Sequence, residues 1–99
     1  RRFWASMTRV HIFVYGRVQG VLYRRFAQKK AEELDITGWA RNLIDGRVEM
    51  VCEGTEESML AFLKWAKKGP FFAQVRATET QKETYRGEFA LFEVREFGF

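Results

Sequence analysis

The order of apolar and polar positions along the chain predicts two helices among several strands. Val10–Tyr15 is rich in aromatic and β-branched residues, which is typical of a strand. Tyr23–Leu34 instead repeats its apolar positions at helical spacing, so we expect an amphipathic helix behind the break at Gly16–Gly20. The expected buried face of this helix consists of Tyr23, Phe26, Ala27, Ala31 and Leu34.

The rest of the chain predicts further strands. Ile36–Asn42 and a segment over residues 47–52 flank Asp45-Gly46, a pair typical of a type I′ hairpin turn. Ala73–Lys82 predicts a fourth strand. Phe89–Arg95 predicts a fifth strand or a continuation of the sheet.

Thr55 is a suitable N-cap for a second helix, and Gly69-Pro70 ends it. The resulting order is β-α-β-β-α-β. It predicts an α+β fold, the ferredoxin-like sandwich, with an antiparallel sheet and two helices on one face. This fold supports enzymes, RNA-binding domains and metal carriers, so function has to be inferred from the residues themselves.

Length and composition set bounds on the class of protein. The chain has 99 residues, 46% of them hydrophobic and 30% charged, which is typical of one compact domain. We interpret residues 7–99 as that domain and residues 1–6 as a leader or a remnant of expression. No apolar run approaches the roughly 18 residues of a membrane-spanning helix, so we expect no membrane partner.

The chain has one cysteine and one histidine, and these two residues limit the possible chemistry. Cys52 alone cannot form an internal disulfide and fits a reducing, cytoplasmic compartment. His11 alone argues against a histidine metal site and against a nucleophile activated by histidine. We expect a buried thiol at Cys52 and a structural role for His11, so catalysis would rest on arginine, asparagine, carboxylates or backbone amides.

The charges are distributed unevenly along the chain. The net charge is +4, yet residues 1–31 contain eight arginines or lysines and no acidic residue. All 13 acidic residues lie from Glu32 onward. A basic first third indicates an anionic ligand, either small or polymeric.

The first predicted helix carries charges opposite to those that its dipole favours. Arg24 and Arg25 lie in its first turn, and Glu32, Glu33 and Asp35 lie at its end. Each such charge costs roughly 0.3–1 kcal/mol at an exposed site. A bound anion would offset this cost, because it would accept hydrogen bonds from the free N–H groups of the first turn and neutralise a guanidinium.

The loop before this helix fits an anion site as well. Gly16 and Gly20 permit positive φ and a close approach of the backbone, so successive N–H groups can surround an anion. The same residues also suit an ordinary turn with two solvated arginines, and both interpretations stay open at this point. A Walker loop is excluded, because no Gly-Lys-Ser/Thr follows.

Two motifs resemble the signatures of the acylphosphatase family. The first signature, Gly-x-Val-Gln-Gly-Val-x-Phe/Met-Arg, is similar to Gly16-Arg17-Val18-Gln19-Gly20-Val21-Leu22-Tyr23-Arg24. The second resembles Gly38-Trp39-Ala40-Arg41-Asn42, followed by Gly46-x-Val48 and Gly54. The likeness covers residues 8–95. Tyr23 departs from the usual Phe or Met, so its hydroxyl needs a partner, and Leu22 adds bulk at a variable position.

The resemblance implies a hydrolase that cleaves the carboxyl-phosphate bond of small acyl phosphates, giving carboxylate and inorganic phosphate. It implies that Arg24 binds the phosphoryl oxygens and that Asn42 orients the attacking water. The backbone amides expected around the phosphoryl group are those of Val18, Gln19, Gly20, Val21, Leu22, Tyr23 and Arg24. We expect no metal, no cofactor, a monomer, and inorganic phosphate as product and inhibitor.

Other interpretations of the same residues stay open. A nucleic-acid-binding module could share the fold and the basic first third, but no stretch matches the aromatic signature of an RNA-recognition motif, so we expect no nucleic-acid partner. Asn42 also suits an ordinary turn. Related domains begin larger carbamoyl-phosphate-using maturation proteins, whereas the short chain favours a free-standing enzyme. A metal carrier is disfavoured, since Cys52 has no partner cysteine.

Overall fold

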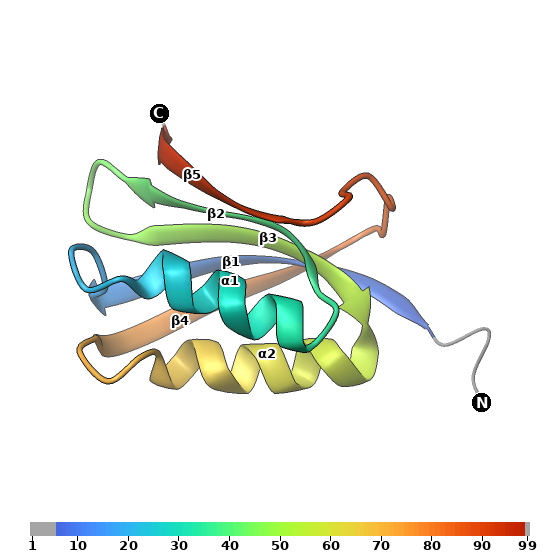
Figure 1. The fold of residues 1–99 in the computed structure, drawn as a ribbon, viewed down its shortest axis with the longest axis horizontal. Helices are drawn as coiled ribbons and strands as arrows, with labels where there is room; N and C mark the ends of the chain where they lie inside the picture. Colours follow the sequence, from blue (N-terminus) through green and yellow to red (C-terminus); the bar gives the residue numbers. More distant parts are fainter. Residues whose placement is uncertain (1–5, 99) are drawn as a thin grey trace.

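The computed structural model describes residues 6–98, which form a layer of five strands and a layer of two helices (Figure 1). The strands are β1 Met7–Arg17, β2 Thr37–Leu43, β3 Val48–Thr55, β4 Gln74–Glu83 and β5 Phe92–Gly98. The helices are α1 Tyr23–Glu33 and α2 Glu56–Lys68. The predicted ferredoxin-like α+β fold is thereby confirmed. Of the proposed leader at 1–6, residues 1–5 lie outside the described residues.

The sheet has the strand order β4-β1-β3-β2-β5. The pairs β1–β3, β1–β4 and β2–β3 are antiparallel, as predicted. The outer pair β2–β5 is parallel, so the sheet is mixed rather than wholly antiparallel. The reason is topological: the chain reverses after β4, crosses to the opposite edge, and therefore runs alongside β2 in the same direction (Figure 1).

Alternate side chains of the central strands form the core beneath the helices. The core contains Val10, Ile12 and Val14 of β1. The thiol of Cys52 in β3 is buried there too, as predicted. From α1, the core receives Tyr23, Ala27 and Ala31, which recur every four residues along one narrow stripe. Phe26 precedes Ala27 by one residue and so points to a different side of the helix. It is 38% exposed, so its predicted burial is wrong.

The hairpin between β2 and β3 differs from the predicted type I′ turn. That turn requires positive φ at both central residues, but only Gly46 has it, at 99°, and Asp45 does not. The N–H of Gly46 instead donates to the carbonyl of Leu43 at 3.1 Å, and strand pairing resumes at Arg47. The Asp45 carboxylate accepts from the Arg47 N–H at 3.1 Å, which stabilises this longer loop.

The sheet face opposite the helices carries a network of ion pairs. Arg9 donates to Glu53 at 3.1 Å and to Glu83 at 2.9 Å. His11 lies beside it, with its Nε2 atom 2.6 Å from a carboxylate oxygen of Glu49. The only histidine of the chain therefore lies on this face, away from the layer of helices.

Candidate functional site

Three connections meet at the same end of the molecule, at the left of Figure 1. They are the loop from β1 to α1 over residues 18–22, the hairpin from β2 to β3, and the loop from α2 to β4 over residues 69–73. The first of them contains the glycine-rich motif, and the second follows Asn42. Two sequence motifs separated along the chain are thus brought to one place.

A hollow of about 220 Å³ lies at this end, between the β1–α1 loop, the start of α1, and strands β2 and β5. It is lined by Val18, Gly20, Leu22, Tyr23, Arg24, Arg25, Asn42 and Val94. The structure therefore brings together six of the predicted site residues, including both residues with predicted catalytic roles. Gln19 and Val21 do not line this hollow. Val21 lines an adjoining one, and the side chain of Gln19 turns toward the hairpin.

Backbone conformation shapes the loop around the hollow. Gly16 has φ of 126° at a register shift between β1 and β4, and a Cβ there would lie 2.2 Å from the carbonyl oxygen of Gln74. Gly20 has φ of 74° with open space where a Cβ would be, so only its conformation favours glycine. Leu22 also has positive φ, 64°, which is uncommon for a branched side chain.

The N-terminus of α1 opens at this loop. Leu22 is the N-cap residue, but no side chain caps the helix, and its first turn contains no acidic residue. The carbonyl of Leu22 accepts the first helical bond, from Phe26 at 3.1 Å. The N–H groups of the first turn and the positive end of the helix dipole therefore suit an anion.

Arg24 is positioned by a strand that the sequence did not associate with the site. Its Nη1 atom donates to the backbone carbonyl of Arg95 in β5, and Val94 of the same strand lines the hollow. This contact requires β5 to lie beside β2, which local sequence patterns do not specify. The remaining N–H groups of the guanidinium fork are available to an anion in the hollow.

Asn42 lies near the end of β2, two residues after the buried Ala40 and thus on the helix-covered face of the sheet. Its Oδ1 atom is buried and has no hydrogen-bond partner among residues 6–98. Leaving a buried acceptor unpaired costs about 1–3 kcal/mol. An unpaired acceptor on a residue that lines the hollow is suited to a water or a ligand N–H.

Gln19 joins the loop to the hairpin. Its Nε2 atom donates to the carbonyl of Leu43 at 2.7 Å and to the carbonyl of Arg47 at 2.9 Å. Asn42 immediately precedes Leu43, so this side chain fixes the distance between the loop and Asn42. The motif placed Gln19 among the phosphate-binding amides, and the role of its side chain was not foreseen.

Tyr23 finds the partner that its hydroxyl needs. The hydroxyl donates to the carbonyl of Ala66 in α2 at 2.8 Å, and the ring packs against Trp65. Burial raises the pKa of Tyr23 well above its usual value, so the side chain stays neutral. Tyr23 therefore anchors α1 to α2.

The charges around the hollow are suited to binding an anion. Its lining contains two guanidinium groups, Arg24 and Arg25, and no carboxylate. Within the part of the chain that the structure describes, no three His, Cys, Asp or Glu residues are grouped as metal ligands. The positive charge that the described residues place at the hollow is that of the two arginines and of the N–H groups at the start of α1.

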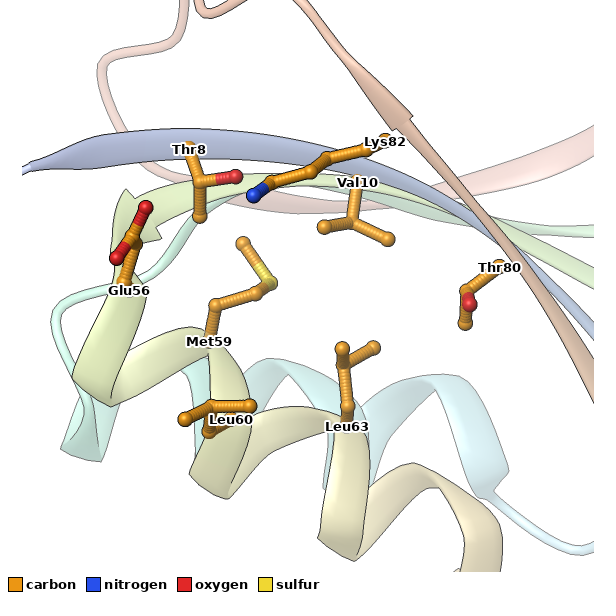
Figure 2. Close-up of a pocket in the computed structure, with 8 residues that line it drawn as sticks. All are labelled: Thr8, Val10, Glu56, Met59, Leu60, Leu63, Thr80 and Lys82. Atoms are coloured by element: carbon orange, nitrogen blue, oxygen red, sulfur yellow. The ribbon is translucent and has the colours of Figure 1, made fainter.

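A different cavity, of about 290 Å³, lies between the first half of α2 and strands β1 and β4 (Figure 2). Its lining is mostly apolar, with Met59 and Leu63 on α2 facing Val10 on β1. Lys82 reaches across it toward Thr8, whose buried hydroxyl has no partner among residues 6–98. None of the predicted site residues lines this cavity, whereas six of them line the hollow beside Arg24.

Comparisons with known proteins find several similar chains. The family model described as Acylphosphatase matches residues 10–94. An acylphosphatase of Methylococcus capsulatus is 52% identical over 88 residues, covering 89% of this chain and 96% of its own. The solved structure of an acylphosphatase from Coxiella burnetii superimposes with a TM-score of 0.88 at 36% identity, covering 94% of this chain and 99% of its own.

A similar domain also occurs within a larger protein. The crystal structure of T. kodakarensis HypF matches with a TM-score of 0.78 at 33% identity, covering 92% of this chain but 12% of that one. Nothing in the matches favours the nucleic-acid-binding alternative. Neither helix in the described range is long and apolar enough to cross a membrane.

Proposed function

Because the chain belongs to the acylphosphatase family and is an acyl-phosphate hydrolase, we propose that the hollow between Gly20, Arg24 and Asn42 is its active site. One observation carries this assignment. Asn42, whose Oδ1 atom has no hydrogen-bond partner among residues 6–98, and Arg24 both line a single hollow, although they come from different elements.

The phosphoryl group is bound by the loop and by Arg24. Its oxygens accept hydrogen bonds from the free N–H groups of the loop and of the first turn of α1, and from the guanidinium fork of Arg24. Val18 and Tyr23 have buried side chains, so they would contribute through the backbone. These donors are fixed before the substrate arrives, and little reorganisation is needed when charge develops.

Asn42 orients the attacking water. The water donates a hydrogen bond to the Oδ1 atom of Asn42, which directs an oxygen lone pair at phosphorus. As the water oxygen bonds to phosphorus, the bond from phosphorus to the acyl oxygen breaks and its electron pair leaves with the carboxylate. A phosphoryl oxygen takes the proton of the water, so the products are a carboxylate and inorganic phosphate.

The mechanism needs no strong base because the bond that breaks is that of an activated mixed anhydride. Phosphoryl transfer depends mainly on in-line positioning and on stabilising charge at the equatorial oxygens. Arg24 and the loop amides supply that charge. We propose on this basis that the reaction proceeds without a bound metal or cofactor.

The same assignment leads to proposals about partners and setting. Inorganic phosphate, as product, would compete for the loop and inhibit the enzyme. We further propose a monomer that works in the cytoplasm, where the buried and unpaired thiol of Cys52 would stay reduced. Sedimentation of the purified chain tests the monomer directly.

The test is the hydrolysis of benzoyl phosphate by the purified chain with and without EDTA. We expect turnover that EDTA leaves unchanged, and a loss of at least about 10³-fold in kcat/KM for Arg24→Ala. Lys29→Ala is the matched control, because it removes one positive charge from the exposed side of the same helix. Absence of turnover, or inhibition by EDTA, would overturn the proposal.

A further inference from the structure

A second hollow adjoins the proposed active site. It is lined by Arg17, Gly20, Val21, Leu22 and Phe72. Gly20 and Leu22 also line the hollow that contains Arg24 and Asn42. The two hollows are therefore separated only by the loop residues that they share, and Leu22 forms part of the wall between them.

The residues around this second hollow expose apolar surface. Leu22 is 59% exposed and Phe72 is 62% exposed. Leu22 projects there because its left-handed conformation ends the loop and begins α1. Phe72 belongs to the α2–β4 loop, which lies at the same end of the molecule in Figure 1.

The ring of Phe72 contacts the ring of its neighbour in the chain. Phe71 and Phe72 pack edge to face, with ring centroids 5.4 Å apart and an interplanar angle of 79°. Phe71 itself is 93% exposed and lines neither hollow. Of these two adjacent aromatic residues, only Phe72 faces the vicinity of the proposed active site.

We propose that the acyl group of the substrate lies across Leu22 and packs against the ring of Phe72, so that these two residues determine which acyl groups this chain accepts. This inference rests on the proposed function, since the phosphoryl group must occupy the hollow beside Arg24. The acyl carbon is separated from phosphorus by one oxygen, so the acyl group lies within reach of the wall that the two hollows share.

The chemistry of the second hollow fits such a group. Covering exposed apolar surface is favourable because it removes that surface from water, and Leu22 and Phe72 present such surface. An aromatic acyl group would gain ring-to-ring packing as well. Arg17, the one charged residue of this lining, is compatible with that occupant because guanidinium planes stack on aromatic faces.

The experiment compares two substrates that share the phosphoryl group and differ in the acyl group. For the wild type and for Phe72→Ala, kcat/KM is measured with benzoyl phosphate and with acetyl phosphate. We expect Phe72→Ala to lower the benzoyl-to-acetyl ratio by about fivefold. Phe72→Leu, which restores apolar surface without a ring, should give an intermediate ratio.

Phe71→Ala is the matched control. It removes the same side chain one position earlier, outside both hollows, and should keep the ratio within about a factor of two of the wild-type value. If the wild type hydrolyses both substrates and Phe72→Ala leaves the ratio unchanged, the acyl subsite is wrong while the proposed function stands. If the wild type hydrolyses neither substrate, the proposed function itself fails.

Discussion

The side-chain amide of Gln19 donates to the backbone carbonyl of Leu43 at 2.7 Å, and this bond connects the β1–α1 loop to the strand that carries Asn42. A second bond from the same nitrogen reaches the carbonyl of Arg47 at 2.9 Å. Both carbonyls belong to the hairpin, so a single side chain sets the spacing between the two halves of the site. Positioning of this kind affects the rate steeply, because a small misplacement of reacting groups costs much of the turnover.

Gln19→Ala should therefore lower kcat with benzoyl phosphate by about tenfold, through misplacement of Asn42 relative to the phosphoryl group. The matched control is Gln28→Ala, because Gln28 makes the same type of bond, from Nε2 to the carbonyl of Phe92 at 3.1 Å, and lines neither hollow. Steady-state kinetics and thermal melting of both variants separate positioning from stability. If the two variants have equal activity and lose equal amounts of Tm, Gln19 has only a structural role and does not position Asn42.

Asn42→Ala should lower kcat about a hundredfold, because the attacking water loses the acceptor that directs it. Inhibition by inorganic phosphate should persist, with an inhibition constant within about a factor of two of the wild type, since Arg24 and the loop are untouched. Asn42→Asp should weaken phosphate inhibition as well, because it introduces a negative charge beside the anion. Loss of phosphate inhibition in Asn42→Ala would contradict a role in water positioning.

Phosphate should raise the melting temperature of the folded chain. A ligand that binds only the native state at 100 times its dissociation constant stabilises it by about 2.7 kcal/mol, which corresponds to roughly 10 °C or more for a domain of this size. The shift should vanish in Arg24→Ala and persist in Lys29→Ala. Sodium chloride at matched ionic strength is the control for screening of the arginines in the first turn of α1. A shift of equal size with chloride would argue against a specific anion site.

Local patterns were sufficient to predict most elements of the fold. The alternation of Val10, Ile12 and Val14 and the N-cap at Thr55, which accepts from the Ser58 N–H at 3.1 Å, are set by nearby residues. The two motifs also predicted that Arg24 and Asn42 would share a site, and the structure brings them to one hollow.

Local patterns could not predict contacts between elements that are distant in the sequence. The parallel pairing of β5 with β2 depends on how the chain crosses the sheet, so the bond from Arg24 to the Arg95 carbonyl could not be foreseen. The exposure of Phe26 depends on which stripe of α1 packs against the sheet. Asp45-Gly46 suggested a two-residue turn, but the pairing of neighbouring strands selected a longer loop.

The network on the open face of the sheet predicts how stability depends on pH. The Glu53 carboxylate accepts from the guanidinium of Arg9 at 3.1 Å and from the N–H of Arg86 at 2.8 Å. Burial acts to raise the pKa of Glu53, but these hydrogen bonds outweigh it and hold the pKa below its usual value. Glu83 contributes in the same direction, because its hydrogen bond from Arg9 lowers the pKa of that carboxyl.

A carboxyl group whose pKa is lower in the folded state stabilises the fold above its unfolded pKa, about 4.3 for glutamate, and that stabilisation is lost as the pH falls through the folded value. The free energy of unfolding should therefore decrease as the pH is lowered below about 4.3. Glu53→Gln should lower the free energy of unfolding by about 3 kcal/mol at pH 7, because the buried Arg9 loses one charged partner. The same variant should make the free energy of unfolding less dependent on pH in the acid range. Urea unfolding at several pH values measures both effects, with the exposed Glu96→Gln as the control. If stability decreases as steeply at acid pH in Glu53→Gln as in the wild type, Glu53 does not cause the decrease.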